Sequence, residues 1–269
     1  MSSMNRRDFL TVASAGALAA SCAAAVPAGS TAPRPLPGAE ARPAAPRLAD
    51  PTGAAFAWSD AERRAIDADR PDFAVVVRGC SDTAVLRARA RAVPPGLDLD
   101  AVAARMERTM RDAEGVGIAG PQVGLSLRIA TLLLDYKTDS PRALFVRNPV
   151  IAERSDETLE GYEGCLSVPG VGGLVRRNRW LRLEYDTADG TIATAEAEGY
   201  NAVLWQHELD HLDGVIYLDR LLGELLPMDE VRRRRKEAEE RERASGTAPP
   251  DQASRGDCLE GAIAITAWS

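Results

Sequence analysis

The chain has 269 residues and a formal net charge of −7, from 40 acidic and 33 basic side chains. This length is enough for one substantial hydrophobic core with appendages. The acidic balance argues against nucleic acid as a partner. The cysteines are too few and too scattered for a disulfide framework or for zinc fingers; they are Cys22, Cys80, Cys165 and Cys258.

The first 28 residues resemble an export signal. Residues 5–10 contain twin arginines followed by Phe-Leu, and residues 10–26 form a mildly apolar run rich in Ala and Ser. This pattern is similar to a twin-arginine signal peptide, and the run is too short and too weakly apolar for a membrane-spanning helix. We therefore expect an exported protein, periplasmic or on the outer surface. A cytoplasmic protein that keeps its N-terminus is the alternative.

Cys22 is a candidate membrane tether. Residues 18–22 are close to a lipoprotein processing box, although Ala19 stands where Leu is usual. Lipidation of Cys22 would anchor the protein, whereas ordinary cleavage near Ala28 would release it. Residues 29–58 are rich in Pro and Ala without apolar periodicity, so we expect them to form a disordered linker.

Apolar runs and turn signals predict the elements up to residue 197. Ser59 and Glu62 have capping-box spacing, which predicts a short helix there. A longer helix is expected from Asp98 to residue 114, ended by Gly115. The predicted strands are residues 73–77, 127–135, 143–146, 150–152, 181–185 and 192–197; residues 143–146 and 150–152 are expected to pair around Asn148, and the last two to form a hairpin around Asp189-Gly190.

The glycine-rich residues 115–122 let the backbone approach another group closely, because several positions lack a bulky Cβ. The run lacks the lysine of a phosphate-binding loop and the third glycine of a dinucleotide fingerprint, so we do not expect nucleotide binding. The residues alone leave two interpretations open, a substrate loop and a tight connection between elements.

Both histidines of the chain lie in residues 206–211, Gln-His-Glu-Leu-Asp-His. Residues four apart on a helix share a face, so His207 and His211 can bind one metal ion, and Glu208 can reach a water beside it. The helix is expected to begin near Tyr200 and to end at Gly214. Cys165 is the best third ligand, because a thiolate with two imidazoles suits Fe(II), Zn or Ni. Without the histidines, a small buried hydrophobe would be the simpler interpretation of Cys165.

A second, highly charged helix is predicted for residues 222–243. Its basic run, residues 232–236, is balanced by glutamates, which favours a solvent-exposed face over an anion site. Residues 59–243 would thus form one catalytic domain, and residues 244–269 a disordered tail.

Three separated motifs resemble the peptide deformylase family. They are Gly-Val-Gly-Ile-Ala-Gly-Pro-Gln at 115–122, Glu-Gly-Cys-Leu-Ser at 163–167 and Gln-His-Glu-Leu-Asp-His at 206–211. The resemblance extends from about residue 73 to residue 222. Gly120 stands where the family usually has a second Ala, and Gly172 stands where an Arg is frequent.

The resemblance implies an α+β fold, with antiparallel sheets packed around a central helix that carries His-Glu-x-x-His, plus a charged C-terminal helix. It implies hydrolytic removal of the formyl group from N-terminal formyl-methionyl peptides, with release of formate. Cys165, His207 and His211 would bind one divalent ion per chain, Fe(II) by resemblance, with Zn or Ni as alternatives. We expect a monomer whose partner is the formylated peptide.

The resemblance also assigns roles to other residues. Glu208 would transfer protons, and the side-chain amide of Gln122 and the backbone N–H of Leu166 would stabilise negative charge on the formyl oxygen. The remaining assigned residues would contact the peptide. They are the backbones of Val116, Gly117 and Gly164, and a methionine pocket lined by Val116, Tyr200, Val203 and Leu204, each of which core packing would explain equally well.

Two other functions compete with deformylation. An exported zinc metalloprotease shares His-Glu-x-x-His, but Tyr217 stands where one protease class needs a third histidine. Another class would need a downstream glutamate such as Glu224 or Glu230. The second alternative is a non-catalytic lipoprotein that binds a metal or a peptide.

Overall fold

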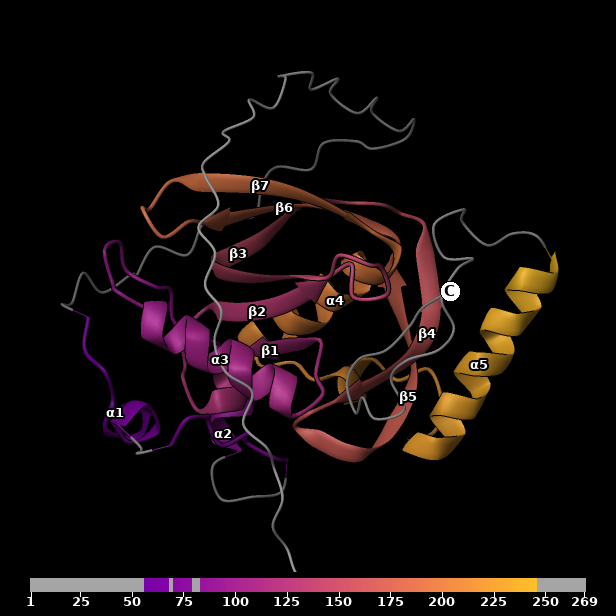
Figure 1. Ribbon diagram of the computed structural model, residues 1–269, viewed down its shortest axis with the longest axis horizontal. Coiled ribbons are helices and arrows are strands. Elements are labelled where there is room, and N and C mark those ends of the chain that lie inside the picture. Colours follow the sequence, from indigo (N-terminus) through magenta and orange to yellow (C-terminus); the bar gives the residue numbers. More distant parts are fainter. Residues whose placement is uncertain (1–55, 68–69, 79–82, 246–269) are drawn as a thin grey trace, which may run out of the picture. The chain divides into compact units, whose positions relative to one another are not determined.

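The computed structural model describes residues 56–67, 70–78 and 83–245 (Figure 1). The predicted signal segment with Cys22, residues 29–55 of the predicted linker and residues 246–269 lie outside the described residues. Of the described helices, none combines the length and the apolar character needed to cross a bilayer. The division into signal, linker, catalytic domain and tail stays a prediction.

Two antiparallel sheets and five α-helices make up the described part of the chain, which confirms the predicted α+β fold class. The five-stranded sheet has the order β1 (Gly117–Ala119), β2 (Ile129–Leu134), β3 (Arg142–Arg154), β6 (Trp180–Asp186) and β7 (Ile192–Glu198). The three-stranded sheet has the order β4 (Thr158–Cys165), β5 (Val168–Asn178) and β8 (Leu226–Pro227). The helices are α1 (Asp60–Asp67), α2 (Ala84–Arg87), α3 (Asp100–Asp112), α4 (Gly199–Leu212) and α5 (Met228–Ser245), with 3-10 turns η1 (Gly120–Val123) and η2 (Tyr217–Arg220).

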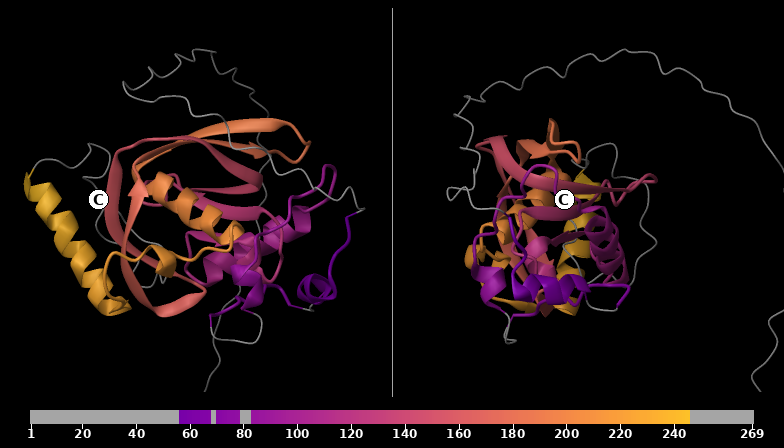
Figure 2. Two further views of the ribbon diagram at one scale, coloured as in Figure 1. Left: turned by 180° about the vertical axis from the view of Figure 1, so that it is seen from behind. Right: turned by 90° about the vertical axis from the view of Figure 1, so that its left-hand side faces the viewer.

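The central element is α4, which lies inside the curve of the two sheets (Figures 1 and 2). Nearly every residue of α4 is buried, so the helix contacts protein on all sides rather than along one stripe. It begins at Gly199 and ends before Gly214, both with a positive φ. A Cβ at Gly214 would lie 2.5 Å from the carbonyl oxygen of Arg87, so the predicted end of this helix is confirmed and only glycine fits there.

The hydrophobic core has two main clusters. One surrounds α4 and contains Leu132, Val146 and Trp205, together with Cys165. The other lies between α3 and the five-stranded sheet and contains Met106 and Ile129. Burying one such side chain contributes about 1.5–3 kcal/mol, so both clusters stabilise the scaffold on which α4 is fixed.

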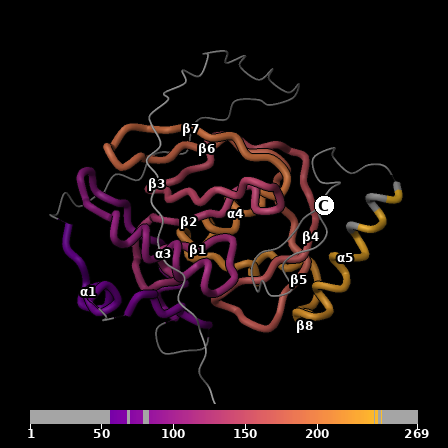
Figure 3. The backbone as a smooth tube through the Cα atoms, in the orientation of Figure 1, coloured from indigo at the N-terminus to yellow at the C-terminus, as the bar shows by residue number. Residues whose placement is uncertain are grey.

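Three sequence-based predictions of elements are wrong. Residues 73–77 are extended but belong to neither sheet; the Val76 amide instead donates to the Gln122 carbonyl oxygen at 2.8 Å. Residues 143–146 and 150–152 do not pair, because both lie in the single strand β3. The charged helix begins at Met228 rather than residue 222, because residues 226–227 first pair with β5 as β8, as the tube in Figure 3 shows.

Asn148 explains why β3 continues through a predicted turn. Its φ is 49°, and a register shift follows it in the β3–β6 pair, so the strand bends without ending. Its side-chain amide donates to the carbonyl oxygen of Val93 at 2.9 Å and to Asp186 at 2.8 Å, and its side-chain oxygen accepts from the Val93 amide. These hydrogen bonds compensate for the strained backbone.

α3 ends in a different way from the prediction. The residue with positive φ is Glu114, at 55°, and not Gly115. Gly115 is favoured for another reason, since a Cβ there would fit tightly, 3.1 Å from both Leu166 Cδ1 and the carbonyl oxygen of Met110.

Candidate metal centre

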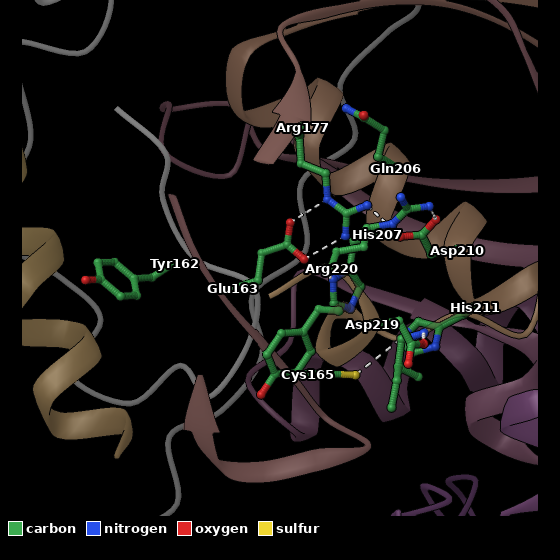
Figure 4. Close-up of polar contacts among 12 residues, drawn as sticks. Tyr162, Glu163, Cys165, Arg177, Gln206, His207, Asp210, His211, Asp219 and Arg220 are labelled. Atoms are coloured by element: carbon green, nitrogen blue, oxygen red, sulfur yellow. Dashed lines mark hydrogen bonds and ion pairs between the residues drawn. The ribbon is translucent and has the colours of Figure 1, made fainter. Parts of the chain in front are cut away.

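Cys165, His207 and His211 each offer one ligand atom to a common point, and these atoms all lie within 4.8 Å of one another. Cys165 Sγ is 3.2 Å from His211 Nε2 (Figure 4). All three side chains are buried. The sequence-based expectation that a distant cysteine meets the two histidines is therefore realised in the fold.

The local backbone explains how the three side chains converge. The two histidines lie four residues apart on α4, with ring centroids 5.0 Å apart. Cys165 ends β4, where the register of the β4–β5 pair shifts between Gly164 and Cys165. Such an irregularity re-aims a side chain, and here it accompanies the turn of the thiol toward α4.

His207 is fixed in orientation by two neighbours. Its Nδ1 is 2.9 Å from Glu163 Oε2, and its ring stacks on Tyr217 with centroids 6.4 Å apart and an interplanar angle of 21°. Its Nε2 is buried and has no hydrogen-bond partner among the described residues. An imidazole that is bound at Nδ1 by a carboxylate and leaves Nε2 free is typical of a metal ligand.

Glu163 is itself held by a chain of buried charges. Arg177 donates two hydrogen bonds to Glu163, at 2.7 and 2.8 Å, and a third at 2.5 Å to Asp210 of α4. Arg220 of η2 donates to both oxygens of Asp210 at 2.6 Å. Burial alone would raise the pKa of Glu163, but the charge and hydrogen bonds of Arg177 outweigh it and keep that pKa well below its usual range.

The other two ligands differ in their readiness to bind a cation. Burial, the neighbouring His207 and the charge of Arg177 lower the pKa of His211 well below its usual value, so its imidazole is neutral. Burial raises the pKa of the Cys165 thiol to about 12. A thiol at this position would therefore release a proton when it ligates a cation. The donor set and the unpartnered Nε2 of His207 fit a divalent metal ion.

Glu208 lies beside the three ligands. Both of its carboxylate oxygens are buried and have no partner among the described residues, and burial raises its pKa well above its usual value. A Cβ at Gly117 of β1 would lie only 2.1 Å from Glu208 Oε1. The glycine in this first motif is therefore required by the close approach of the carboxylate.

Gln122 points its side-chain amide into the same site. Its Oε1 accepts from the Ala119 amide at 2.8 Å, which leaves its Nε2 3.4 Å from Cys165 Sγ and 3.3 Å from Ser167 Oγ. The backbone contact fixes which end of the amide faces the cysteine. Leu166, the other predicted donor, follows Cys165 directly in the turn between β4 and β5.

The predicted peptide-contacting residues divide into two groups. Gly117 lies in β1 and Gly164 lies in β4, next to the ligand Cys165. The four proposed pocket residues, Val116, Tyr200, Val203 and Leu204, are all buried in the cluster around α4. Packing accounts for their burial, and their role in a methionine pocket stays a prediction.

The sequence alone did not predict the roles of Glu163, Arg177 and Asp210, or the stacking of Tyr217 on His207. Glu163 lies in the motif that contains Cys165, and Asp210 lies in the motif that contains the two histidines. An acidic residue close to each metal ligand was thus the sequence feature that could have pointed to them. A metal-binding imidazole needs an acceptor for its second nitrogen, and this rule could have pointed to a carboxylate. Arg177 has no such signal, because it lies 14 residues from Glu163 and 33 from Asp210.

A family model described as polypeptide deformylase matches residues 78–224, which is more than half of the chain. The chain belongs to the peptide deformylase family. It is 40% identical over 151 residues to the peptide deformylase of Thermus thermophilus, covering 51% of this chain and 77% of that protein. It is 44% identical over 113 residues to the peptide deformylase of a Parafrankia species, covering 42% of this chain and 60% of that protein.

A solved structure gives a similar result. The peptide deformylase of Acinetobacter baumannii with Met-Ala-Ser bound is 33% identical, with a TM-score of 0.50, and the match covers 56% of this chain and 98% of that one. Enzymes of this family are metal-dependent hydrolases, and the cysteine–histidine cluster of this chain agrees with that requirement. Family membership favours deformylation over the protease and the non-catalytic lipoprotein.

Proposed function

We propose that this chain removes the formyl group from N-terminal formyl-methionyl peptides and releases formate. The observation that carries the proposal is the meeting of Cys165, His207 and His211 at one point, with the unpartnered carboxylate of Glu208 beside them. The family to which the chain belongs supports the same reaction. The peptide bound to the Acinetobacter relative begins with methionine, which supports the substrate class.

Cys165, His207 and His211 would hold the metal ion. When bound, a divalent ion at such a site supplies Lewis acidity that polarises water and carbonyl oxygens. One thiolate and two imidazoles suit Fe(II), Zn or Ni, and we propose Fe(II) because of the family resemblance.

Glu208 is the proton carrier in this proposal. Its raised pKa makes the carboxylate a stronger proton acceptor than an exposed glutamate, because its buried position disfavours the charged form. It would take a proton from the attacking water and deliver it to the nitrogen of the leaving peptide. Its oxygens are free for this role, since neither has a partner among the described residues.

Gln122 and Leu166 would stabilise the negative charge that develops on the formyl oxygen. The amide of Gln122 is already fixed with its N–H₂ group toward the centre by the Ala119 contact. A donor that needs no reorganisation contributes most, and losing one typically costs about 100–1,000-fold in rate.

β1 offers an edge for an extended peptide, because it is the last strand of the five-stranded sheet. Backbone groups of Val116 and Gly117 on this side, and of Gly164 on β4, would bind the substrate as an added strand. Val116, Tyr200, Val203 and Leu204 would line the methionine pocket. This arrangement explains why the first and second motifs are rich in glycine.

Proteolysis has weaker support from the geometry. The chain has no third histidine, and Glu230 is engaged by Arg233 and Arg234 on α5. Cys165 already completes a three-ligand cluster with the two histidines.

Formate release from formyl-Met-Ala-Ser by the purified, metal-loaded chain tests the proposal. We expect formate and the free amino terminus of the peptide to be released in equal amounts. We expect the Cys165→Ser variant to lose its metal or most of its turnover. Bound metal without formate would favour the non-catalytic alternative, and cleavage of an internal peptide bond would favour a protease.

We further propose that the protein is exported, with Cys22 as a lipid tether, on the basis of the sequence of residues 1–28. Deformylation of new protein chains takes place in the cytosol, so an exported form would act on formylated peptides elsewhere. Oxidants outside the cytosol threaten ferrous iron and the Cys165 thiolate, so for an exported form we propose a metal less prone to oxidation than iron in place of Fe(II). Cell fractionation tests this: a protein found only in the cytosol with its N-terminus intact would contradict it.

A further inference from the structure

β4 lies between two helices that contact opposite faces of the strand (Figures 1 and 2). Side chains alternate along a strand, so Tyr162 and Glu163 point to opposite faces, and Gly164 shares the face of Tyr162. Glu163 and Cys165 contact the two histidines of α4. Tyr162 points away from this cluster, toward α5 (Figure 4). The strand that supplies the sulfur ligand is thus packed from behind by the C-terminal helix.

Met228, the first residue of α5, fills a space formed by two glycines. Gly164 and Gly172 lie opposite each other in the β4–β5 pair, and we call them the glycine socket. A Cβ at Gly164 would lie 2.7 Å from Met228 Cε, and one at Gly172 would lie 3.4 Å from the same atom and 3.2 Å from Val231 Cγ2. The socket is therefore closed by α5. A Cβ at Gly164 would push against the end of the Met228 side chain, and one at Gly172 would also lie 2.6 Å from the backbone oxygen of Glu163 in β4.

Two arginines of α5 bind Tyr162. Arg235 Nη2 donates to the backbone oxygen of Tyr162 at 2.8 Å, and Arg234 Nη1 donates to its hydroxyl at 3.0 Å. Arg235 is only 8% exposed. The sequence-based prediction that residues 232–236 form a solvent-exposed face is therefore wrong for Arg235. These hydrogen bonds fix the strand at Tyr162, three residues before the cysteine ligand.

We propose that α5 is a brace for the metal centre, in which Met228, Val231 and Arg235 are positioning residues that keep β4 against α4. β4 is an edge strand of its sheet, with β5 as its only strand neighbour among the described residues, so the flanking helices must fix its remaining freedom. The inference rests on the proposed metal centre. It adds a role for a helix outside residues 78–224, the part that the family model matches.

The physical reason is that a close-packed strand cannot move until a neighbour yields. Removing the Met228 side chain would empty the glycine socket, and surrounding groups relax only partly into such a cavity. A small shift of β4 would change the distance between Cys165 Sγ and the histidines. The metal would then be held less firmly, although none of its ligands had been altered.

Cobalt(II) is a suitable probe, because absorption from the thiolate–cobalt bond reports the Cys165 contact independently of activity. The test variants in the full chain are Met228→Ala and Arg235→Met, with Met228→Leu as the conservative replacement. Arg232→Ala is a control on the exposed side of α5, and Met106→Ala removes a fully buried methionine from the other core cluster.

We expect Met228→Ala and Arg235→Met to release cobalt to a chelator about 10-fold faster than wild type. Mutating residues that support a metal ligand typically lowers metal affinity by about 10–100-fold, and we expect the lower end of that range. Met228→Leu and both controls should release it at the wild-type rate. Amide hydrogen exchange of the metal-free proteins should be faster in residues 158–165 of Met228→Ala and unchanged in β2.

Wild-type cobalt release and wild-type exchange in a folded Met228→Ala variant would overturn the brace. Equally fast release from Met106→Ala would also overturn it, because global stability rather than the position of β4 would then set the rate. A wild-type protein that shows no thiolate–cobalt absorption would overturn the proposed metal centre itself, and the brace with it.

Discussion

α4 and α5 flank the same strand but work in opposite ways. α4 is buried on nearly all sides, and its polar residues His207, Glu208 and His211 are among the least exposed in the described structure. α5 buries Met228, Val231 and Arg235 and exposes most of its charged side chains, several of them paired along the helix. Polar side chains that are buried have shifted pKa values and can keep ligand atoms without a hydrogen-bond partner. The proposed metal ligands and proton carrier on a helix are therefore those of α4. α5 contributes by packing and by the hydrogen bonds of Arg234 and Arg235 to Tyr162.

The largest effect that this contrast predicts is at Glu208. Glu208→Gln keeps the shape of the side chain but removes the proton acceptor, so turnover should fall by about 100–10,000-fold. Formate release from formyl-Met-Ala-Ser measures the loss, and metal analysis should find one ion per chain as in wild type. If turnover stayed within a factor of two of wild type, Glu208 would not be the proton carrier.

Gly117→Ala should have the next largest effect, because it acts on α4 through Glu208. The added Cβ would meet Glu208 Oε1 at 2.1 Å and Leu204 Cδ1 at 2.9 Å. The carboxylate must move, and a misplacement of about 1 Å at a reacting group can cost on the order of 100-fold. Formate release should fall accordingly. Gly223→Ala, where no atom lies within 4 Å, is the matched control and should behave as wild type.

Asp210→Asn tests the buried charges that join α4 to Glu163. Asp210 accepts hydrogen bonds from both Arg177 and Arg220, so the substitution weakens the support of Arg177 on Glu163 and, through it, of His207. We expect metal affinity to fall by about 10-fold, as is usual for residues that support a ligand. Competition with a chelator measures it. Unchanged metal affinity would show that Arg177 holds Glu163 in place without help from Asp210.

The smallest effect is expected on the exposed face of α5. Hydrogen bonds from Arg233 and then Arg234 lower the pKa of Glu230 to about 2, so any stability from these pairs is present at neutral pH and lost only as the pH falls toward that value. Because the site is exposed, Glu230→Gln at pH 7 should leave turnover, metal retention and the unfolding midpoint close to wild type. A marked loss of metal would mean that the whole helix, and not its buried face, supports the centre.

The sequence was sufficient for the parts of the site that depend on local spacing. His207 and His211 share a helix face because they are four residues apart, and Gly214 marks the helix end by its conformation. Cys165 could be paired with them because the chain has no other histidine. The α+β fold class was implied by the family resemblance that the three motifs carry together, not by any one element.

Long-range contacts could not be predicted in this way. The bend at Asn148 depends on hydrogen bonds to Val93 and Asp186, so residues 143–152 were interpreted as two strands instead of one. The β4–β5 hairpin was not predicted. Its paired glycines, Gly164 and Gly172, make room for the Met228 side chain and do not form a turn. Arg177 looked like any surface arginine until the fold brought it between Glu163 and Asp210.

X-ray absorption of the zinc-loaded protein tests the central claim most directly, because it counts the atoms bound to the ion. The account predicts one sulfur at about 2.3 Å and two imidazole nitrogens at about 2.0–2.1 Å, with the sulfur lost in Cys165→Ser. A wild-type spectrum without sulfur, or with a single imidazole, would contradict the meeting of β4 and α4 at one metal ion.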